Sequence, residues 1–150
     1  MKYTKEIIIN LPRKDVLTKM ENPDNFKHWQ DGFISNKHIS GQPGIEGARS
    51  MLSFRMGKRK IEMIETIIKN NLPDELHTTY QAKGVYNIQK NYFKEVDKNT
   101  TKWVSYNEFK FSGFMKLIGF IMPGAFEKQS LKYMQNFKSF AEEGKSIRDN

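Results

Sequence analysis

Few side chains in this sequence have the types and spacing that metal or nucleophilic chemistry requires. The three histidines, His28, His38 and His77, lack the i, i+4 and His-x-His spacings that bring metal ligands together. The chain has no cysteine, which excludes disulfides, thiolate metal sites and a cysteine nucleophile. No Gly-x-Ser-x-Gly, Walker or dinucleotide-binding motif occurs. The sequence therefore predicts no metal site and no cofactor.

General acid–base chemistry in a pocket remains, and Glu65 is its most informative candidate. In the run IEMIETII, Glu65 shares one face of a predicted strand with Ile61, Met63 and Ile67. If that face is buried, desolvation raises the pKa of the Glu65 carboxyl and makes it a candidate acid or base. The opposite orientation leaves Glu65 in water. We favour this solvated placement, because an unpaired buried glutamate is rare.

Tyr80, His38 and Arg55 are the other acid–base candidates, and each has a structural interpretation as well. His38 and Arg55 fit surface positions, whereas Tyr80 fits a packed core position with its hydroxyl paired. The sequence therefore assigns no catalytic residue.

Length and charge limit the class of protein and of partner. The chain has 150 residues and no linker or repeat, so we expect one domain over 1–150 with a disordered tail from about residue 145 to 150. A net charge of +8 is compatible with anionic partners. The densest basic cluster, RMGKRK at residues 55–60, lies between two strand-like runs. A solvated hairpin turn is favoured there over a phosphate-binding patch.

The most hydrophobic stretch, GFMKLIGFIMPGAF at residues 113–126, is too short to be a membrane anchor. A spanning helix needs about 20 apolar residues, and Lys116 and Pro123-Gly124 interrupt this run. The first residues also lack the features of a signal peptide. We therefore expect a cytoplasmic protein in which this stretch leads into a helix, either as a movable lid hinged at its glycines or as plain core packing.

The pattern of the chain predicts one strand, two short helices, a meander and a long helix. Residues 3–10 alternate as a strand, and Leu11-Pro12 and Asn22-Pro23 introduce two short helical segments. From residue 33 to residue 111, strand-like runs alternate with turn signals, as in an antiparallel meander with one wet face. Residues 123–143 have helical periodicity, with proline at the start and glycine after the end.

This order of elements resembles the START-like helix-grip superfamily, also called SRPBCC, over essentially the whole chain. The similar segments are INLPRKDVLTKMENPDNFKHW, PGIEGARS, NNLPDEL and the pair Thr100-Thr101. The sequence looks most similar to the polyketide cyclase/dehydrase-like bacterial proteins of that superfamily. The resemblance implies an α+β helix-grip fold. In that fold, a seven-stranded antiparallel curved sheet wraps around one long C-terminal helix, with two short helices between strands 1 and 2.

The resemblance further implies a deep cavity between the sheet and the long helix, and strand alternation indicates which residues line it. In the last strand, Trp103, Ser105, Asn107 and Phe109 share a face without charges, which is the better inner face. The same argument places the amides of residues 87–91 inside, although β propensity would bury Tyr86, Ile88 and Tyr92 instead. The predicted lining comprises Trp29, Leu52, Phe54, Thr78, Tyr80, Asn87, Gln89, Asn91, Trp103, Ser105, Asn107, Phe109, Phe114, Leu117, Ile118, Phe126, Ser130, Tyr133 and Phe137.

Three functions remain open. The preferred one is binding of a small hydrophobic or amphipathic ligand, such as a lipid, a polyketide or an isoprenoid-like molecule. The alternative is a cyclase or dehydratase without metal or nucleotide cofactor, which a buried Glu65 near Tyr80 or His77 would favour. The third is an interaction protein whose basic surface binds RNA, the ribosome or an anionic membrane; DNA is not an expected partner.

Overall fold

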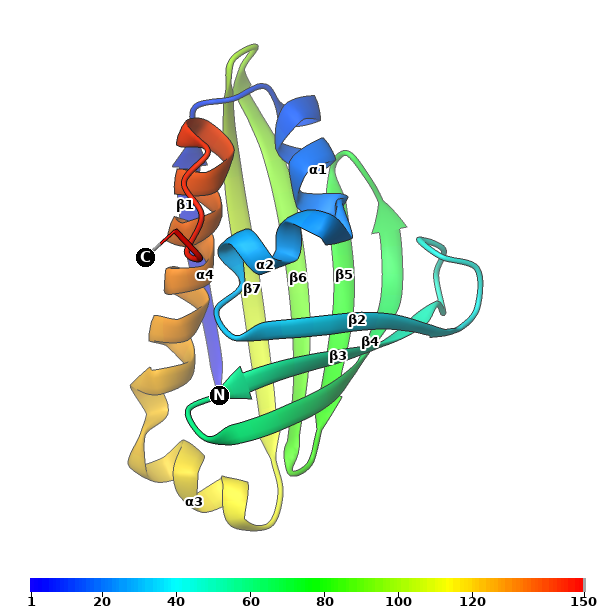
Figure 1. Cartoon of the computed structure of the whole chain (residues 1–150), viewed down its shortest axis with the longest axis vertical. Helices are drawn as coiled ribbons and strands as arrows, with labels where there is room; N and C mark the ends of the chain where they lie inside the picture. Colours follow the sequence, from blue (N-terminus) through cyan, green and yellow to red (C-terminus); the bar gives the residue numbers. More distant parts are fainter. Residues whose placement is uncertain (150) are drawn as a thin grey trace.

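A computed structural model describes residues 1–149 and shows a strongly curled antiparallel sheet with helices along one side (Figure 1). The seven strands follow the order β1-β7-β6-β5-β4-β3-β2. Their bounds are β1 Lys2–Ile9, β2 Phe33–Ser40, β3 Arg49–Met56, β4 Arg59–Asn71, β5 Glu75–Ala82, β6 Val85–Asp97 and β7 Thr100–Phe111. In Figure 1, β5, β6 and β7 run vertically while β2 and β3 cross in front of them. The curl gives the sheet a concave face.

The helices close the open side of this concave face. They are α1 Arg13–Glu21, the 3₁₀ turn η1 Pro23–Asn25, α2 Phe26–Trp29, α3 Phe114–Ile121 and α4 Pro123–Glu143. The long helix α4 lies beside β1 and contacts α2, while α3 lies at the lower end of the molecule (Figure 1). The predicted sheet, the two short helices and the long helix over residues 123–143 are therefore present.

The long helix begins and ends where the sequence predicts. Pro123 occupies its first turn, where the missing N–H needs no partner. Gly144 follows the last turn with a left-handed φ of 69°, and its N–H donates a hydrogen bond to the Phe140 carbonyl over 2.9 Å. The hydrophobic stretch before it forms a separate helix, α3. Met122 leaves helical geometry between the two.

Residues 145–149 are held against the protein, which differs from the predicted disordered tail. His28 Nδ1 lies 2.8 Å from the Ser146 hydroxyl, and the Ile147 N–H donates to the His28 carbonyl over 3.1 Å. The Arg148 guanidinium donates to the Phe33 carbonyl over 3.0 Å. Residue 150 lies outside the described residues. The segment after α4 therefore joins α2 and β2, a contact that its polar composition does not indicate.

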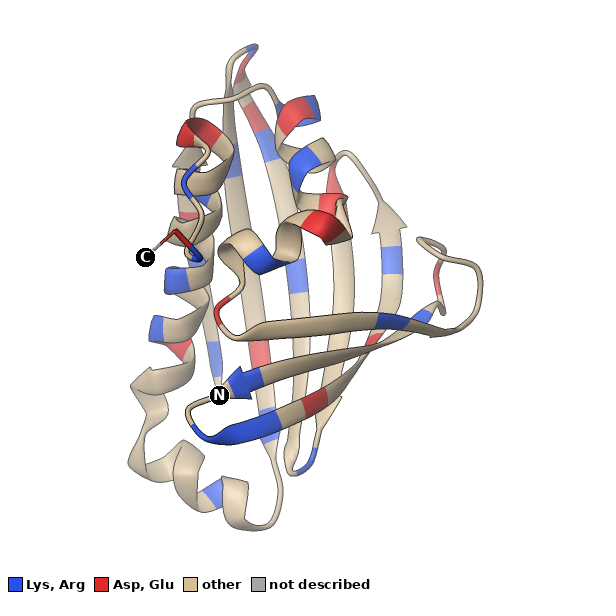
Figure 2. Cartoon of the chain, in the orientation of Figure 1, with Lys and Arg blue, Asp and Glu red and all other residues tan. Residues whose placement is uncertain are grey.

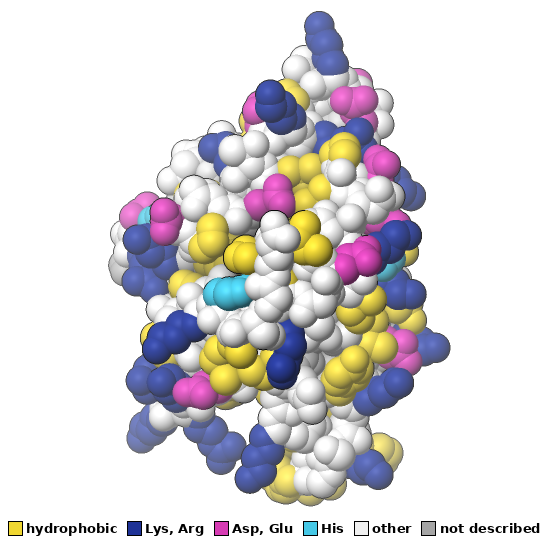
Figure 3. Space-filling view, turned by 90° about the vertical axis from the view of Figure 1, so that its right-hand side faces the viewer, with side chains coloured by type: hydrophobic (Ala, Val, Ile, Leu, Met, Phe, Trp, Pro, Cys, Tyr) yellow, Lys and Arg dark blue, Asp and Glu magenta, His cyan; other side chains and the backbone are white. Residues whose placement is uncertain are grey.

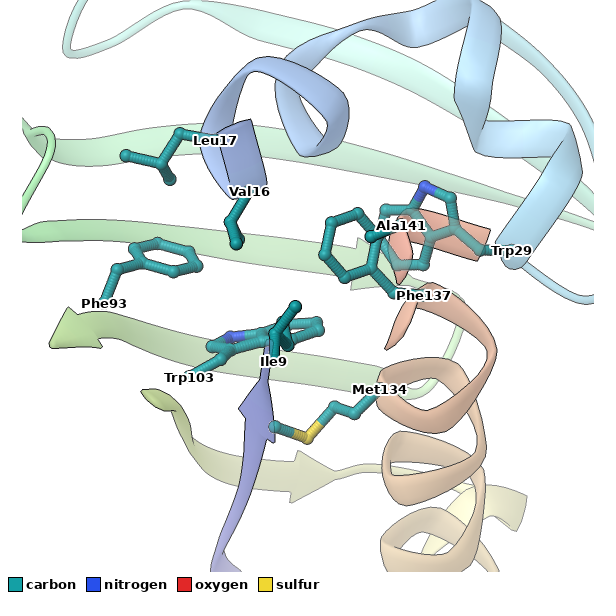
Figure 4. Packing of buried hydrophobic residues seen from close by; sticks show 9 residues of the cluster. All are labelled: Ile9, Val16, Leu17, Trp29, Phe93, Trp103, Met134, Phe137 and Ala141. Carbon is teal, nitrogen blue, oxygen red and sulfur yellow. The ribbon is translucent and has the colours of Figure 1, made fainter. Parts of the chain in front are cut away.

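An aromatic cluster fills the interior between α1, α2, α4 and the sheet (Figure 4). The Phe137 ring lies 5.1 Å from the Trp29 ring and 5.7 Å from the Trp103 ring, both edge to face. Phe93 stacks on Trp103 at 6.2 Å from the other side. Such edge-to-face and stacked contacts add to the free energy of burying these large side chains. The cluster therefore fixes α2 and α4 relative to β6 and β7.

Truncating Phe137 should remove the central contact of this cluster. Because Phe137 is fully buried, Phe137→Ala should lower the free energy of unfolding by about 3 to 5 kcal/mol. Phe120→Ala is the matched control, since the Phe120 side chain is 84% exposed and its loss should cost less than about 0.5 kcal/mol. Urea unfolding followed by tryptophan fluorescence measures both. Equal effects of the two substitutions would contradict this assignment of the core.

Candidate ligand-binding site

Strand register places a row of polar side chains across the concave face of the sheet. Ser50 pairs with Glu65, Glu65 pairs with Tyr80, and Tyr80 pairs with Asn87 on the next strand. Directly paired residues of neighbouring strands share a face, so these four side chains form one row from β3 to β6. We call Ser50, Glu65, Tyr80 and Asn87 the polar row.

Glu65 lies on the concave face, and the prediction that it is solvated is wrong. Burial raises the pKa of the Glu65 carboxyl above its ordinary value, and the neighbouring Tyr80 hydroxyl partly offsets that rise. The sequence of β4 alone does not show which residue of the neighbouring strand pairs with Glu65. Tyr80 supplies a hydroxyl from the adjacent strand, so the buried carboxyl is not alone.

Tyr80 is the second titratable group of the polar row. Burial raises the pKa of its hydroxyl well above the ordinary value, and the negative charge of Glu65 raises it further. The Tyr80 hydroxyl therefore stays protonated and can donate a hydrogen bond to Glu65 or to a bound molecule. His77 lies on the opposite face of β5, where it pairs with Lys90, and so takes no part in the row. His38 and Arg55 are exposed.

The amide side chains next to the polar row, Asn87 among them, hydrogen-bond to one another. The Asn107 Oδ1 accepts hydrogen bonds from Asn87 Nδ2 at 3.3 Å and from Gln89 Nε2 at 3.2 Å. Asn91 Nδ2 donates to Gln89 Oε1, and Asn91 Oδ1 accepts from the Trp103 indole over 2.9 Å. The amides therefore point inward, as the sequence predicts. They also pair with one another, so their orientation alone does not require a ligand. Tyr86, Ile88 and Tyr92 lie on the outer face.

Two buried polar atoms of the concave face have no partner among the described residues. They are Thr78 Oγ1, on a side chain that is 3% exposed, and Asn36 Oδ1 on β2. Thr78 precedes Tyr80 by two residues on β5, and Asn36 pairs with Leu52, two residues from Ser50 on β3. The two therefore lie on either side of the polar row. A buried polar atom without a partner costs about 1 to 3 kcal/mol, which favours a ligand or water that meets it.

The α4 wall of the site is tied to the sheet by Tyr3, a residue that the predicted lining omits. The Tyr3 hydroxyl lies 2.6 Å from Ser130 Oγ and donates to the Phe126 carbonyl over 3.1 Å. Burial raises the pKa of Tyr3 to about 12. The Phe126 ring lies 4.9 Å from the Phe109 ring, and the Tyr133 hydroxyl donates to the Asp31 carbonyl. Alternation along the first strand was the signal that could have identified Tyr3.

The other predicted lining residues divide into core, concave face and surface. Trp29, Trp103 and Phe137 pack against one another in the aromatic cluster, and Leu52 and Phe54 are buried under the sheet's curl. Ser105 is buried beside the amides and accepts a hydrogen bond from Asn107 Nδ2.

Phe114 and Leu117 are corrections to the predicted lining, because they are 68% and 50% exposed. The opposite face of α3 packs on the sheet instead: a Cβ added to Gly119 would meet the Phe111 ring at 2.8 Å. Ile118 is half-buried. Whether α3 moves as a lid stays a prediction.

Two surface hollows lie outside the concave face. One, of about 390 Å³, lies between α1, the β4–β5 loop at Pro73 and β6 at Glu95. The other, of about 220 Å³, lies at the turn between β5 and β6. The deep cavity that the resemblance implies is not among them. The inner side chains of β4, at Ile61, Met63 and Glu65, are nevertheless partly exposed, so the candidate site is this partly open stretch of the concave face.

Comparison with known proteins bears on the fold. No protein-family model and no curated protein matches the chain. A conserved protein from Geobacillus kaustophilus matches in structure with a TM-score of 0.80 and 12% identity, over 97% of each chain. The Zhui aromatase/cyclase from Streptomyces sp. R1128 matches with a TM-score of 0.78 and 10% identity, over 95% of this chain and 93% of that one.

The norcoclaurine synthase from Thalictrum flavum matches with a TM-score of 0.70 and 15% identity, over 95% of this chain and 94% of that one. The chain has the helix-grip fold. Identities this low establish the helix-grip fold and leave the activity open, since one fold serves many functions.

Two further observations concern metal ligands and membrane-spanning helices. Within residues 1–149, His, Asp and Glu side chains nowhere gather in the groups of three that could hold a metal ion. No helix in the same part of the chain combines the length and the apolar character needed to cross a membrane.

The raised pKa of Glu65 gives stability a specific pH dependence. The folded state binds the Glu65 proton more tightly than the unfolded state, so this contribution to stability is full below pH 4.5 and is lost as pH rises through the raised pKa. Glu65→Gln does not titrate. Its free energy of unfolding, relative to the wild type, should therefore increase as pH rises from about 4.5 to 8.

Urea unfolding at a series of pH values measures this difference. Glu62→Gln is the control, because Glu62 is exposed on the other face of β4 and its replacement should change stability by less than about 0.5 kcal/mol at every pH. A Glu65→Gln variant that loses stability relative to the wild type as pH rises would show that Glu65 is not a buried, raised-pKa carboxyl.

Proposed function

We propose that the protein binds a small, mostly apolar molecule with an uncharged polar group on the concave face of its sheet. The observation that carries this proposal is the buried Thr78 hydroxyl beside the Glu65–Tyr80 pair. It has no hydrogen bond of ordinary geometry among the described residues, although it lies close enough to Tyr80 to lower the pKa of that hydroxyl. Ile61, Met63 and Ile67 of β4 share the concave face with this polar spot, and binding sites typically combine an apolar lining with a few placed polar groups.

The electrostatics of the polar row favour an uncharged polar group on the ligand. A carboxyl whose pKa is raised by burial is already in an environment that disfavours negative charge. An anionic head group next to Glu65 would raise that cost further. A hydroxyl or carbonyl group can instead accept a hydrogen bond from Tyr80 or exchange one with Thr78. The ligand class is therefore an alcohol, ketone or phenol on an apolar skeleton.

Removing the Thr78 hydroxyl separates a ligand role from a structural one. Thr78→Val keeps the shape of the side chain but removes a buried hydroxyl that has no hydrogen bond of ordinary geometry among the described residues. The substitution should leave stability unchanged or raise it by about 1 kcal/mol, and should weaken ligand binding by about 5-fold to 30-fold. Native mass spectrometry of the protein purified from its own host identifies the small molecule that travels with it, and titration of that molecule gives the affinity.

Thr79→Val is the matched control, because Thr79 is the next residue on β5, is buried, and lies on the opposite face. It should leave the affinity unchanged. Nile red, a neutral apolar dye, serves as a second probe that needs no Thr78 hydrogen bond and should bind both variants alike. If Thr78→Val destabilises the protein and binds the natural molecule as tightly as the wild type, the ligand proposal fails.

Acid–base catalysis at the same place is a second candidate, and the Glu65–Tyr80 pairing favours it. A carboxyl whose pKa is raised by burial keeps its proton to a higher pH than an ordinary glutamate and can act as an acid, and a protonated phenol beside it can stabilise a developing oxyanion. Two of the matched structures are named as enzymes, an aromatase/cyclase and a norcoclaurine synthase. A cyclisation or dehydration of the bound molecule is the reaction that these two groups could support.

Glu65→Gln tests catalysis without removing the site's shape. The small molecules extracted from the host are incubated with wild type and variant, and the products are compared by mass spectrometry. An enzyme should produce either a molecule lighter than the starting one by one water, or an isomer of the same mass with a different chromatographic retention time. Glu65→Gln should lower that rate by about 100-fold or more, while native mass spectrometry still detects binding. Binding without turnover in the wild type would leave the binding proposal and remove the enzyme.

A further inference from the structure

One helix, α3, exposes several large hydrophobic side chains together. Phe114, Leu117, Phe120 and Ile121 are 68%, 50%, 84% and 62% exposed, and we call these four side chains the α3 face. Met122, directly after the helix, is 53% exposed. Contiguous exposed apolar side chains of this size mark interaction surfaces more often than free surfaces. A contact outside this chain is therefore expected for them.

The rest of the fold does not cover the α3 face. Helical spacing places Met115 and Gly119 on the side of α3 that packs on the sheet. There, Gly119 lies against the Phe111 ring, and the Met115 side chain lies against Gly84 in the β5–β6 turn. The α3 face lies on the other side of the helix. Moving it inward would break the packing of Gly119 on Phe111. The exposure thus follows from how α3 is anchored.

Basic residues surround the α3 face, and acidic residues are absent from its segment. Residues 109–126 contain Lys110 and Lys116 but no Asp or Glu. Lys83 lies in the β5–β6 turn, whose Gly84 contacts Met115. The β3–β4 turn adds RMGKRK at residues 55–60, and Figure 2 shows that all these segments lie toward the same lower end of the molecule.

Figure 3 shows hydrophobic side chains at that lower tip with Lys and Arg on both sides of them. Within the described part of the chain, Lys60 is the one basic residue of this set with an ion pair, to Glu62 at 3.4 Å. The positive charge around the α3 face is therefore available to a partner.

We infer that the α3 face docks the protein on an anionic membrane surface. Apolar side chains on one face of a helix, with cationic side chains at its margins, are what an interfacial helix presents to a bilayer. The aromatic and aliphatic groups enter the boundary of the acyl chains, while the lysines meet anionic head groups. Nucleic acid would use the lysines but leave Phe120 and Ile121 in water, so the combination favours lipid.

The dimensions of α3 fit a helix that lies on the surface. Eight residues at about 1.5 Å each give about 12 Å, far short of the bilayer core. Binding by one short helix is weak and reversible unless charge assists it, because each basic residue near an anionic surface strengthens binding about 5-fold. Docking should therefore depend on both the apolar face and the charge. This inference does not depend on the proposed ligand.

Sedimentation with vesicles tests the inference on the full chain. Vesicles of phosphatidylcholine with about 30% phosphatidylserine should bind the protein, and pure phosphatidylcholine vesicles should bind it weakly. High salt should lower the binding to anionic vesicles. Phe120→Glu should lower it by about 10-fold or more, since it removes a large apolar group and adds a negative charge. Phe120→Trp should show a blue shift of its fluorescence on binding.

Val96→Glu is the matched control, because Val96 is 56% exposed near the β6–β7 turn, at the opposite end of the molecule. It makes the same change in charge and should retain binding. Both residues are exposed, so urea unfolding should show both variants folded. Equal loss in the two variants, or salt-sensitive binding that Phe120→Glu leaves intact, would overturn the inference. So would a wild-type dimer that Phe120→Glu dissociates without any vesicle binding, since a second copy would then cover the face.

Discussion

The packing of Phe137 between Trp29 and Trp103 is the contact on which the remaining structure depends. It joins α4, α2 and β7, three elements far apart in sequence, and so fixes where the long helix crosses the concave face. Because α4 is held at this end and along β1, the inner side chains of β4 are not packed beneath it. The partial exposure of Ile61, Met63 and Glu65 follows from that geometry. The candidate site is thus a consequence of where the core lies.

The polar interior divides into a satisfied part and an unsatisfied part, and the difference has a physical meaning. The amides of β6 and β7 bond to one another, and one of them accepts from the Trp103 indole, so they rigidify the sheet without needing a ligand. Thr78 and Asn36 have polar atoms that nothing in the described chain meets. Under the proposed function, recognition of a polar group on the ligand would rest on these two residues and on the Glu65–Tyr80 pair.

Periodicity along single strands and helices predicted the fold well, because each such signal is local. The bounds of α4 and the inner face of β7 follow from alternation, proline and glycine. The face of Glu65 did not follow, because the pairing with Tyr80 depends on the register of β4 and β5, which one strand does not reveal. Phe114 and Leu117 were misplaced for a similar reason. Their hydrophobicity predicted burial, but the space at Gly119 determines which side of α3 packs.

Glu65 and the exposed side chains of α3 both differ from what the sequence predicts, and for a related physical reason. A carboxyl in the interior and phenylalanines in water both oppose the preferences that drive folding, and each lowers stability relative to an ordinary choice at that position. Sequences that specify one fold are consistent across local and global levels, except where function requires otherwise. Glu65 under the sheet and Phe120 on α3 lie at separate places, and each has complementary groups beside it: Tyr80 for the carboxyl, lysines for the apolar face. The proposed ligand and the inferred membrane contact would account for both departures, whereas the requirements of folding do not.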